Sequence, residues 1–373
     1  MMFVSFIIIL AIILAYAEDK KVIKNGITMS FWLIVIVFSL RYGYGNDFKT
    51  YEELFYSIIS YPSLGTAIHE NASIEPGWVA LNYLCKPLGF QFVLVITTLC
   101  VCYIYYYLIK KYVPKPYTWV GILIFLMYPN LFVLNLSMLR QGLAGALFFL
   151  SFIKGYENKW IHSIILIFLA VSVHQIAIIC IPFVLMINIK RILNPAFLVL
   201  VIIASFVFCI IAPFIIEELF GNIMSIDYAD ESYSNYLSRG GAKDIRLALF
   251  TRLIVVIPSI ICFRKLKELD KYLTIMFIIS PFTILLSTQL VLLLRLECFF
   301  LPFSTLLFSR LLSTEIIFDR RPINWSLIKP AMIIVSLGWT FFSARSFFHF
   351  FSEPTYAKHY ATFHTVFSIL FPQ

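Results

Sequence analysis

The chain has 373 residues, of which 61% are hydrophobic and only 13% are charged. Soluble domains carry about a quarter charged residues, so this composition excludes a soluble globular protein. The net charge of +9 does not indicate nucleic acid as a partner, because in a membrane protein the distribution of charge along the chain is more informative than its sum.

Apolar runs of about 17 to 25 residues follow one another along the chain, and helices of this length cross a hydrocarbon layer roughly 30 Å thick. We therefore predict an all-α polytopic membrane protein, in which residues 1–373 form a single transmembrane domain of about 12 helices. The predicted spans are residues 2–17, 26–41, 89–109, 117–137, 139–153, 160–174, 176–189, 195–216, 247–263, 272–294, 296–312 and 329–348.

The loops between these spans form two alternating sets that differ in charge. One set carries most of the lysines, including Lys110 and Lys111, whereas the other has more acids than bases. The positive-inside rule makes the first set cytoplasmic and places both chain ends outside. The predicted outer segments are then residues 42–88 and 217–246, with an outer C-terminal tail over residues 349–373.

The N-terminal run has a second interpretation, since Ala15-Tyr16-Ala17 is similar to a signal-peptide cleavage site. No base precedes the run, however, and cleavage would leave Lys20 and Lys21 outside. We therefore favour a retained first helix. The cysteines lie almost entirely within predicted spans and contain no CxxC, which is typical of small packing residues.

The first long polar interruption of the chain, residues 41–75, begins RYGYGNDFKTYEELF. Its glycines end the preceding helix, and acids outnumber bases within it. Residues 47–60 are predicted to form a short helix on the membrane surface. A second short helix is predicted over residues 78–88, opened by Pro76. We expect this segment to cap an active site at the outer face.

Arginine dominates the bases at the outer boundary, whereas lysine dominates the cytoplasmic side. Arginine binds phosphate through two parallel hydrogen bonds, so this bias favours a diphosphate site. Its members would be Arg41, Arg140, Arg295, Arg239 and Arg246, with Arg252 and Arg345 nearby. The alternative is that these side chains reach toward the interface or pair with carboxylates.

Three acids at the outer side, Asp47, Glu75 and Glu297, are candidates for deprotonating an acceptor hydroxyl. A carboxylate at a low-dielectric boundary is expected to have a raised pKa, which suits a general base. Pairing with a neighbouring arginine is the alternative, and for Glu297 beside Arg295 it is the favoured one.

His174 ends a predicted span, where it could act as a base, donate a hydrogen bond to phosphate, or simply pack. The tail histidines His349, His359 and His364 are too loosely spaced for a metal site, so we predict no metal and no cofactor. Trp78 and Tyr233 could offer flat faces to sugars, although anchoring at the interface explains them equally well.

No predicted cytoplasmic loop could hold a nucleotide-binding domain, and neither GxxxxGK[ST] nor GxGxxG occurs. Any group that the protein transfers must therefore arrive already activated. A lipid carrier is the expected donor.

Four blocks together resemble the EpsG-like branch of Wzy-type polysaccharide polymerases. In chain order they are RYGYGNDFKTYEELF, IEPGWVALNYL, SMLRQGLAGALFFLSFIKG and VSVHQIAIICIPFVL. The resemblance covers about residues 41–185 and implicates Arg41, Asp47, Tyr51, Glu75, Gly77, Arg140, Gln141 and His174. Gln175 departs from the pattern, in which a small residue usually follows the histidine.

The resemblance implies a membrane-embedded glycosyltransferase of GT-C-like architecture that polymerises O-antigen or a similar surface polysaccharide. Its substrates would be undecaprenyl-diphosphate-linked glycans at the outer face of the bacterial cytoplasmic (inner) membrane. Membrane lipids, a chain-length regulator and a flippase are the expected partners. Tyr51 and Gln141 would contact sugar together with Trp78 and Tyr233.

Within that resemblance, Asp47 or Glu75 would deprotonate the acceptor while arginines stabilise the leaving diphosphate. An O-antigen ligase-like enzyme would have nearly the same site chemistry, so it stays an alternative. A polysaccharide flippase or transporter is a further one. The middles of the predicted spans are nearly free of charge, which counts against transport.

Overall fold

The computed structural model describes residues 2–200, 202–204, 266–287, 294–313, 328–360 and 362–367, with isolated positions 207, 211 and 263. Helices make up nearly all of the regular structure in this part of the chain, which confirms the all-α prediction. The predicted outer segment 217–246 and nearly all of span 247–263 lie outside the described residues.

In chain order the helices of the N-terminal half are α1 (Met2–Asp19), α2 (Gly26–Ser39), α3 (Phe48–Ile59), α4 (Leu64–Glu70), α5 (Pro76–Leu84), α6 (Phe90–Tyr112), α7 (Thr118–Met127), α8 (Val133–Ser137), α9 (Leu139–Tyr156), α10 (Trp160–Val173) and α11 (Ile181–Leu185). Short 3₁₀ turns cover Lys86–Leu88, Pro129–Leu131, Gln175–Cys180, Met186–Asn188 and Lys190–Leu193. The later helices are α15 (Glu268–Ser287), α16 (Leu294–Phe300), α17 (Phe303–Ser313), α18 (Ile328–Ser352) and α19 (Pro354–Tyr360).

Three helices in the described residues are long and apolar enough to cross a membrane: Met2–Asp19, Phe90–Tyr112 and Pro330–Ser352. Helices α7 and α8 make a fourth if they are counted as one broken span. The expected 12 spans and the GT-C architecture stay predictions.

Two spans that were predicted to be continuous are broken at prolines. The predicted span 117–137 bends by 92° between α7 and the segment that begins at Pro129. Tyr128 there has extended backbone (φ −83°, ψ 115°), because the residue before a proline avoids the helical region. The predicted span 296–312 is likewise divided into α16 and α17, with Pro302 at the break. Proline lacks the N–H that would continue the helix.

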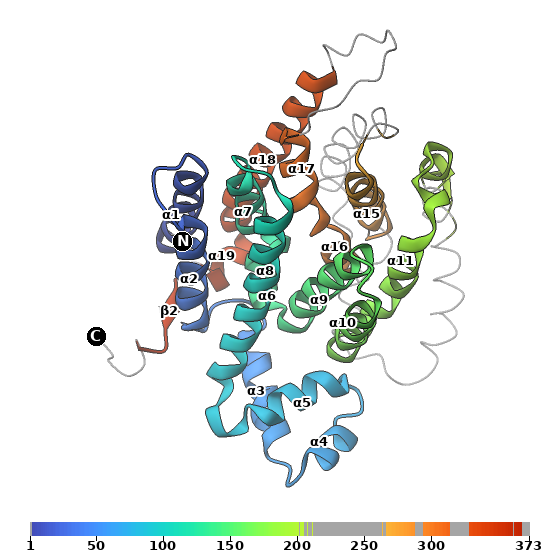
Figure 1. Ribbon diagram of the computed structural model, residues 1–373. Helices are drawn as coiled ribbons and strands as arrows, with labels where there is room; N and C mark the ends of the chain where they lie inside the picture. The colour runs from blue at the N-terminus through green and yellow to red at the C-terminus, as the bar shows by residue number, and fades with distance from the viewer. Residues whose placement is uncertain are drawn as a thin grey trace.

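Helices α3, α4 and α5 form a separate group at the lower end of the bundle in Figure 1. They confirm the predicted short helices of the first outer segment. Helix α3 is amphipathic and buries Phe48 and Phe55 against Phe90 at the start of α6, with ring centroids 5.5 and 5.8 Å apart. Ser63 caps α4 by accepting a hydrogen bond from the Thr66 N–H at 3.2 Å.

The opposite end of α6 carries charged contacts of a different kind. Lys111, near the last residue of α6, pairs with Glu157 after α9. Lys115 pairs with Glu18 of α1 at 2.8 Å, and Arg310 of α17 pairs with Asp270 at 2.5 Å. Three of the bases that were predicted to share the cytoplasmic side therefore lie at one end of the bundle. The orientation of this end in a membrane stays a prediction.

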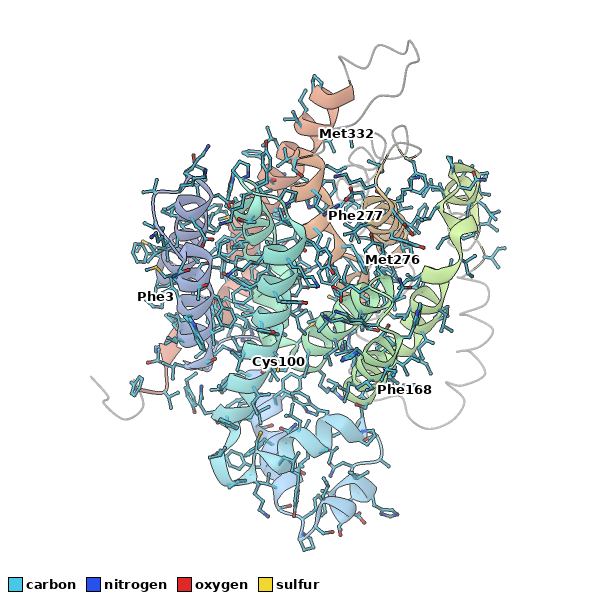
Figure 2. All side chains as sticks on the ribbon, in the orientation of Figure 1. Phe3, Cys100, Phe168, Met276, Phe277 and Met332 are labelled. Atoms are coloured by element: carbon cyan, nitrogen blue, oxygen red, sulfur yellow. The ribbon has the colours of Figure 1, made fainter. Side chains whose placement is uncertain are left out.

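The core between the two ends is filled with aromatic side chains. Met276 and Phe277 of α15 lie inside the bundle and are fully buried, whereas Phe168 of α10 points outward and is 63% exposed (Figure 2). Described cysteines are free thiols, mostly buried, as expected for packing residues. A short antiparallel sheet joins β1 (Arg41–Tyr42) to β2 (His364–Thr365) near the end of the chain.

Candidate functional site

Glu75 begins α5 and is placed by the two residues that follow it. Pro76 occupies the first turn, where its missing N–H costs nothing. Gly77 lies so close to α10 that a Cβ would stand 2.3 Å from Ser172 Oγ and 2.7 Å from the Ser172 carbonyl oxygen. The absence of a side chain at Gly77 thus lets α5 approach α10. This approach brings Glu75 to His174, just beyond the end of α10.

The Glu75 carboxylate accepts three hydrogen bonds from distant parts of the chain. Arg140 Nη1, at the start of α9, donates to Glu75 Oε2 at 2.7 Å. Oε1 lies 3.0 Å from His174 Nδ1 and accepts from the Gln175 N–H at 3.0 Å. The side chains of Glu75 and His174 are both only 9% exposed. This cluster joins three of the four blocks singled out in the sequence.

The partners of Glu75 determine its ionisation. Burial alone would raise the pKa of Glu75. The hydrogen bonds from His174 and the Gln175 N–H, with the charge of Arg140, instead lower the pKa to about 2. Glu75 is therefore a carboxylate at neutral pH and a poor base, contrary to the raised pKa expected from the sequence. Because this carboxylate accepts from His174, the imidazole Nδ1 carries the proton. His174 Nε2 is buried and has no hydrogen-bond partner among the described residues.

Asp47 lies in a different electrostatic environment beside the same cluster. Its backbone N–H donates to Ser137 Oγ at 3.0 Å, which fixes the start of α3 against α8. Burial raises the pKa of Asp47, and the nearby charges of Arg295, Arg140 and His359 only partly offset this. No described residue donates a hydrogen bond to its carboxylate. Asp47 therefore has the raised pKa that suits a general base.

Tyr51, one turn into α3, interacts both with Asp47 and with Arg140, the partner of Glu75. Its phenol lies beside the Arg140 guanidinium, and its ring packs edge-on against Trp78 with centroids 5.5 Å apart. Burial raises the pKa of the Tyr51 hydroxyl, so it stays protonated and able to donate a hydrogen bond.

A comparison with families of related sequences matches residues 24–354, most of the chain, to the EpsG family. The chain belongs to the EpsG family. It is an all-α membrane protein of a family associated with polysaccharide biosynthesis, and the resemblance drawn from the sequence is confirmed. No curated protein and no solved structure matches the chain.

Arg41 has a structural role in this EpsG-family protein. It is fully buried, and Nη1 donates to the Phe38 carbonyl at 2.5 Å and to Thr98 Oγ1 at 2.8 Å. Nη2 donates to the Leu136 carbonyl at 3.0 Å, and a cavity of about 10 Å³, room for about one water, lies beside it. Arg41 therefore holds the end of α2 against α6 and α8, and its guanidinium is not open to a diphosphate. The sequence-based assignment does not fit this burial.

Two predicted sugar contacts also have other partners. Trp78 is fully buried, so its indole offers no face to a sugar. Gln141 is buried, and its Nε2 donates to the Arg295 carbonyl at 2.6 Å. Gln141 thus fixes the start of α16, where Arg295 lies near Asp47. Trp78 and Gln141, both residues of the sequence motifs, therefore pack between elements of the fold.

Glu297 does not pair with Arg295 as the sequence suggested. It is buried on α16, and its Oε2 accepts a hydrogen bond from Asn130 Nδ2 at 3.0 Å. The remaining predicted site residues, Arg239, Arg246 and Tyr233, lie outside the described residues, as does Arg252.

Sequence reasoning missed Ser137 and His359, which both lie near Asp47. Ser137 is the first residue of the block SMLRQGLAGALFFLSFIKG, and His359 is one of the tail histidines that were considered only for a metal site. A Cβ on Gly45 would stand 3.0 Å from Ser137 Oγ, and Gly45 has φ +113°. The glycines of RYGYGND were therefore the sequence feature that could have indicated the close approach to Ser137. Within the described residues no group of three or more His, Cys, Asp or Glu is placed to hold a metal ion.

Proposed function

We propose that this protein is a membrane polymerase of O-antigen or a similar polysaccharide. It joins undecaprenyl-diphosphate-linked oligosaccharide repeat units by glycosyl transfer at the outer face of the bacterial cytoplasmic membrane. Membership of the EpsG family supports the class of reaction. The observation that carries the proposal is the position of Asp47 beside Arg140 and Arg295, which come from two different helices.

The arrangement supplies the two kinds of group that glycosyl transfer from a diphosphate needs. The acceptor hydroxyl must lose a proton, and a carboxylate with a raised pKa and no hydrogen-bond donor among the described residues can take it. The leaving diphosphate gains charge as its bond breaks, and two guanidinium groups can stabilise that charge. Arg140 is 28% exposed, so it can reach a ligand as well as Glu75.

The donor is the growing chain on undecaprenyl diphosphate, and the acceptor is one repeat unit on a second carrier. The acceptor oxygen forms a bond to the donor's anomeric carbon while the bond from that carbon to the diphosphate oxygen breaks. Asp47 receives the hydroxyl proton, and the electron pair of the broken bond stays on the diphosphate. Arg140 and Arg295 stabilise this charge.

Glu75 and His174 position Arg140. A carboxylate with a pKa of about 2 does not compete for the acceptor proton, but it holds the Arg140 guanidinium in one orientation. His174 and the Gln175 N–H in turn hold the carboxylate.

The proposal is tested by reconstituting the purified protein in liposomes with one lipid-linked repeat unit. A polymerase lengthens the glycan on its carrier and releases undecaprenyl diphosphate in equal amount. Asp47→Asn and Arg140→Gln should lower both products together, Arg140→Gln more strongly, whereas His349→Gln, at an exposed site on α18, should leave both unchanged.

Other outcomes point to the alternatives. Transfer that needs an added lipid A-core acceptor, with no lengthening on the carrier, would indicate a ligase. Movement of the lipid-linked unit across the bilayer without a new glycosidic bond would indicate a flippase. Deletion in cells gives an independent check, because loss of a polymerase leaves single repeat units on the core.

A further inference from the structure

The C-terminal tail returns to the start of the first outer segment. In the two-stranded sheet Arg41 pairs with Thr365 and Tyr42 with His364. The Val366 N–H donates to the Leu40 carbonyl at 3.0 Å. These backbone contacts join the C-terminal tail to the segment that begins at Arg41, a contact that the sequence did not predict.

Aromatic packing extends this contact from the sheet to α19. Tyr44 and Tyr360 are both fully buried, with ring centroids 5.0 Å apart, and Tyr44 also packs on Phe363 at 5.1 Å. The Gly45 N–H donates to the carbonyl of His359 at 3.3 Å. Gly45 is two residues before Asp47, so the tail is fixed beside the candidate base.

His359 is the tail residue that this contact brings to the site. Its side chain is exposed, and its charge acts on Asp47 together with those of Arg140 and Arg295. Basic residues of α9, α16 and α19 thus all act electrostatically on Asp47. Arg41, by contrast, is bonded to three internal acceptors away from solvent. The third basic residue that acts on Asp47 comes from the C-terminal tail.

We propose that His359 is a binding residue of this site, which in its protonated form contacts the diphosphate of a lipid carrier together with Arg140 and Arg295. The inference rests on the proposed function, because it takes the diphosphate as the ligand. It adds a substrate-binding role for the C-terminal tail and makes that binding depend on the external pH.

His359 belongs to a group of basic residues that act on one carboxylate. Among the described residues, Arg295, Arg140 and His359 are the bases whose charges act on Asp47, at the start of α3. Lys358 precedes His359 on α19 and is exposed. An imidazole near several cations gains its strongest interaction when an anion enters among them. A diphosphate is such an anion.

The test measures binding of farnesyl diphosphate, a short prenyl diphosphate, to the full-length protein in nanodiscs at about pH 5.5 and about pH 8, which bracket the usual imidazole range. The variants are His359→Gln, His359→Arg and the control His349→Gln, a second exposed tail histidine. Arg140→Gln reports on the proposed function itself. Thermal unfolding of each variant checks that the fold is intact.

At about pH 5.5 His359→Gln should bind about tenfold more weakly than the wild type, as expected for loss of one charge-assisted hydrogen bond. His359→Arg should match the wild type at the low pH and bind about tenfold more tightly than it at the high pH, because arginine stays charged. Comparison of variants at one pH removes the titration of the ligand. His349→Gln should behave as the wild type throughout.

If His359→Gln binds as the wild type at the low pH while Arg140→Gln has lost binding, the role of His359 is wrong and the diphosphate site stands. If Arg140→Gln also binds as the wild type, or the wild type does not bind at either pH, the proposed function fails as well. Equal binding by His359→Arg and the wild type at the high pH would contradict the charge-based role.

Discussion

Glu75 and His174 lie 99 positions apart in the chain, yet Glu75 Oε1 is 3.0 Å from His174 Nδ1. This contact joins the group of helices α3, α4 and α5 to the bundle. It also fixes the carboxylate that holds Arg140. The properties of the candidate site follow from this contact and from the different environment of Asp47.

Replacement of Arg140 by alanine should lower polymerisation by about 10² to 10³-fold, the usual effect of removing one donor that stabilises developing charge. Asp47→Asn should be less damaging, because diphosphate is a good leaving group that reduces the need for a base. Product formed by the two variants at equal protein levels gives the comparison. Normal polymerisation by the Arg140 variant in cells would exclude its assignment to the diphosphate.

The rate should fall at acid pH as Asp47 becomes protonated. Burial raises its pKa, so the fall begins at a higher pH than for an ordinary aspartate. Arg295→Gln removes a charge that lowers the pKa of Asp47, and the acid limb should therefore move to still higher pH. The measurement is the pH profile of initial rates. If the acid limb of the profile is unchanged in this variant, the charge of Arg295 does not lower the pKa of Asp47.

The stability of the protein should depend on Glu75 in a defined pH range. Its pKa in the fold, about 2, lies below the ordinary 4.5. The ionised carboxylate therefore stabilises the fold fully above about pH 4.5, and this contribution is lost as the pH falls toward 2. Glu75→Gln should lower the melting temperature most at neutral pH, with the difference shrinking at acid pH. Melting curves in detergent would show this, and a difference that grows on acidification would contradict it.

Gly77→Ala should destabilise the protein by about 1–3 kcal/mol through overpacking. The new Cβ would stand 2.7 Å from the Ser172 backbone oxygen, so α5 must move away from α10. The matched control is Gly65→Ala on α4, where the nearest atom to a Cβ is Ser63 Oγ at 3.9 Å. Equal melting temperatures for the two variants would show that the close approach at Gly77 is not required.

Gln141→Leu should weaken activity although Gln141 touches no substrate in the proposed mechanism. The variant loses the part-buried hydrogen bond from the Gln141 side chain to the Arg295 carbonyl. We expect activity to fall about tenfold, mainly through weaker substrate binding as Arg295 is displaced. Initial rates over a range of lipid-linked substrate test this. A loss of maximal rate at unchanged apparent affinity would favour a direct catalytic role.

The outer segment shows how far local sequence signals reach. Glycines at positions 43 and 45, and Pro76 at the start of α5, limit the helices through backbone geometry that depends on a few neighbouring residues. These local rules correctly predicted α3 and α5. The proline breaks after Tyr128 and at Pro302 were equally local, but the strong apolar pattern around them concealed them.

By itself, the sequence determined the membrane class, the short helices α3 and α5, the family resemblance and the motif residues Glu75, Arg140 and His174, because composition, hydropathy and local backbone preference are properties of the chain. Only the tertiary structure decided what these residues do. Burial and hydrogen-bond partners set the pKa of a carboxylate. Glu75 and Asp47 were both predicted from the sequence to be general bases, but the fold lowers the pKa of Glu75 and raises that of Asp47. Folding likewise buries Arg41 and places His359 against Gly45, two residues before Asp47. Neither contact follows from the spacing of residues along the chain.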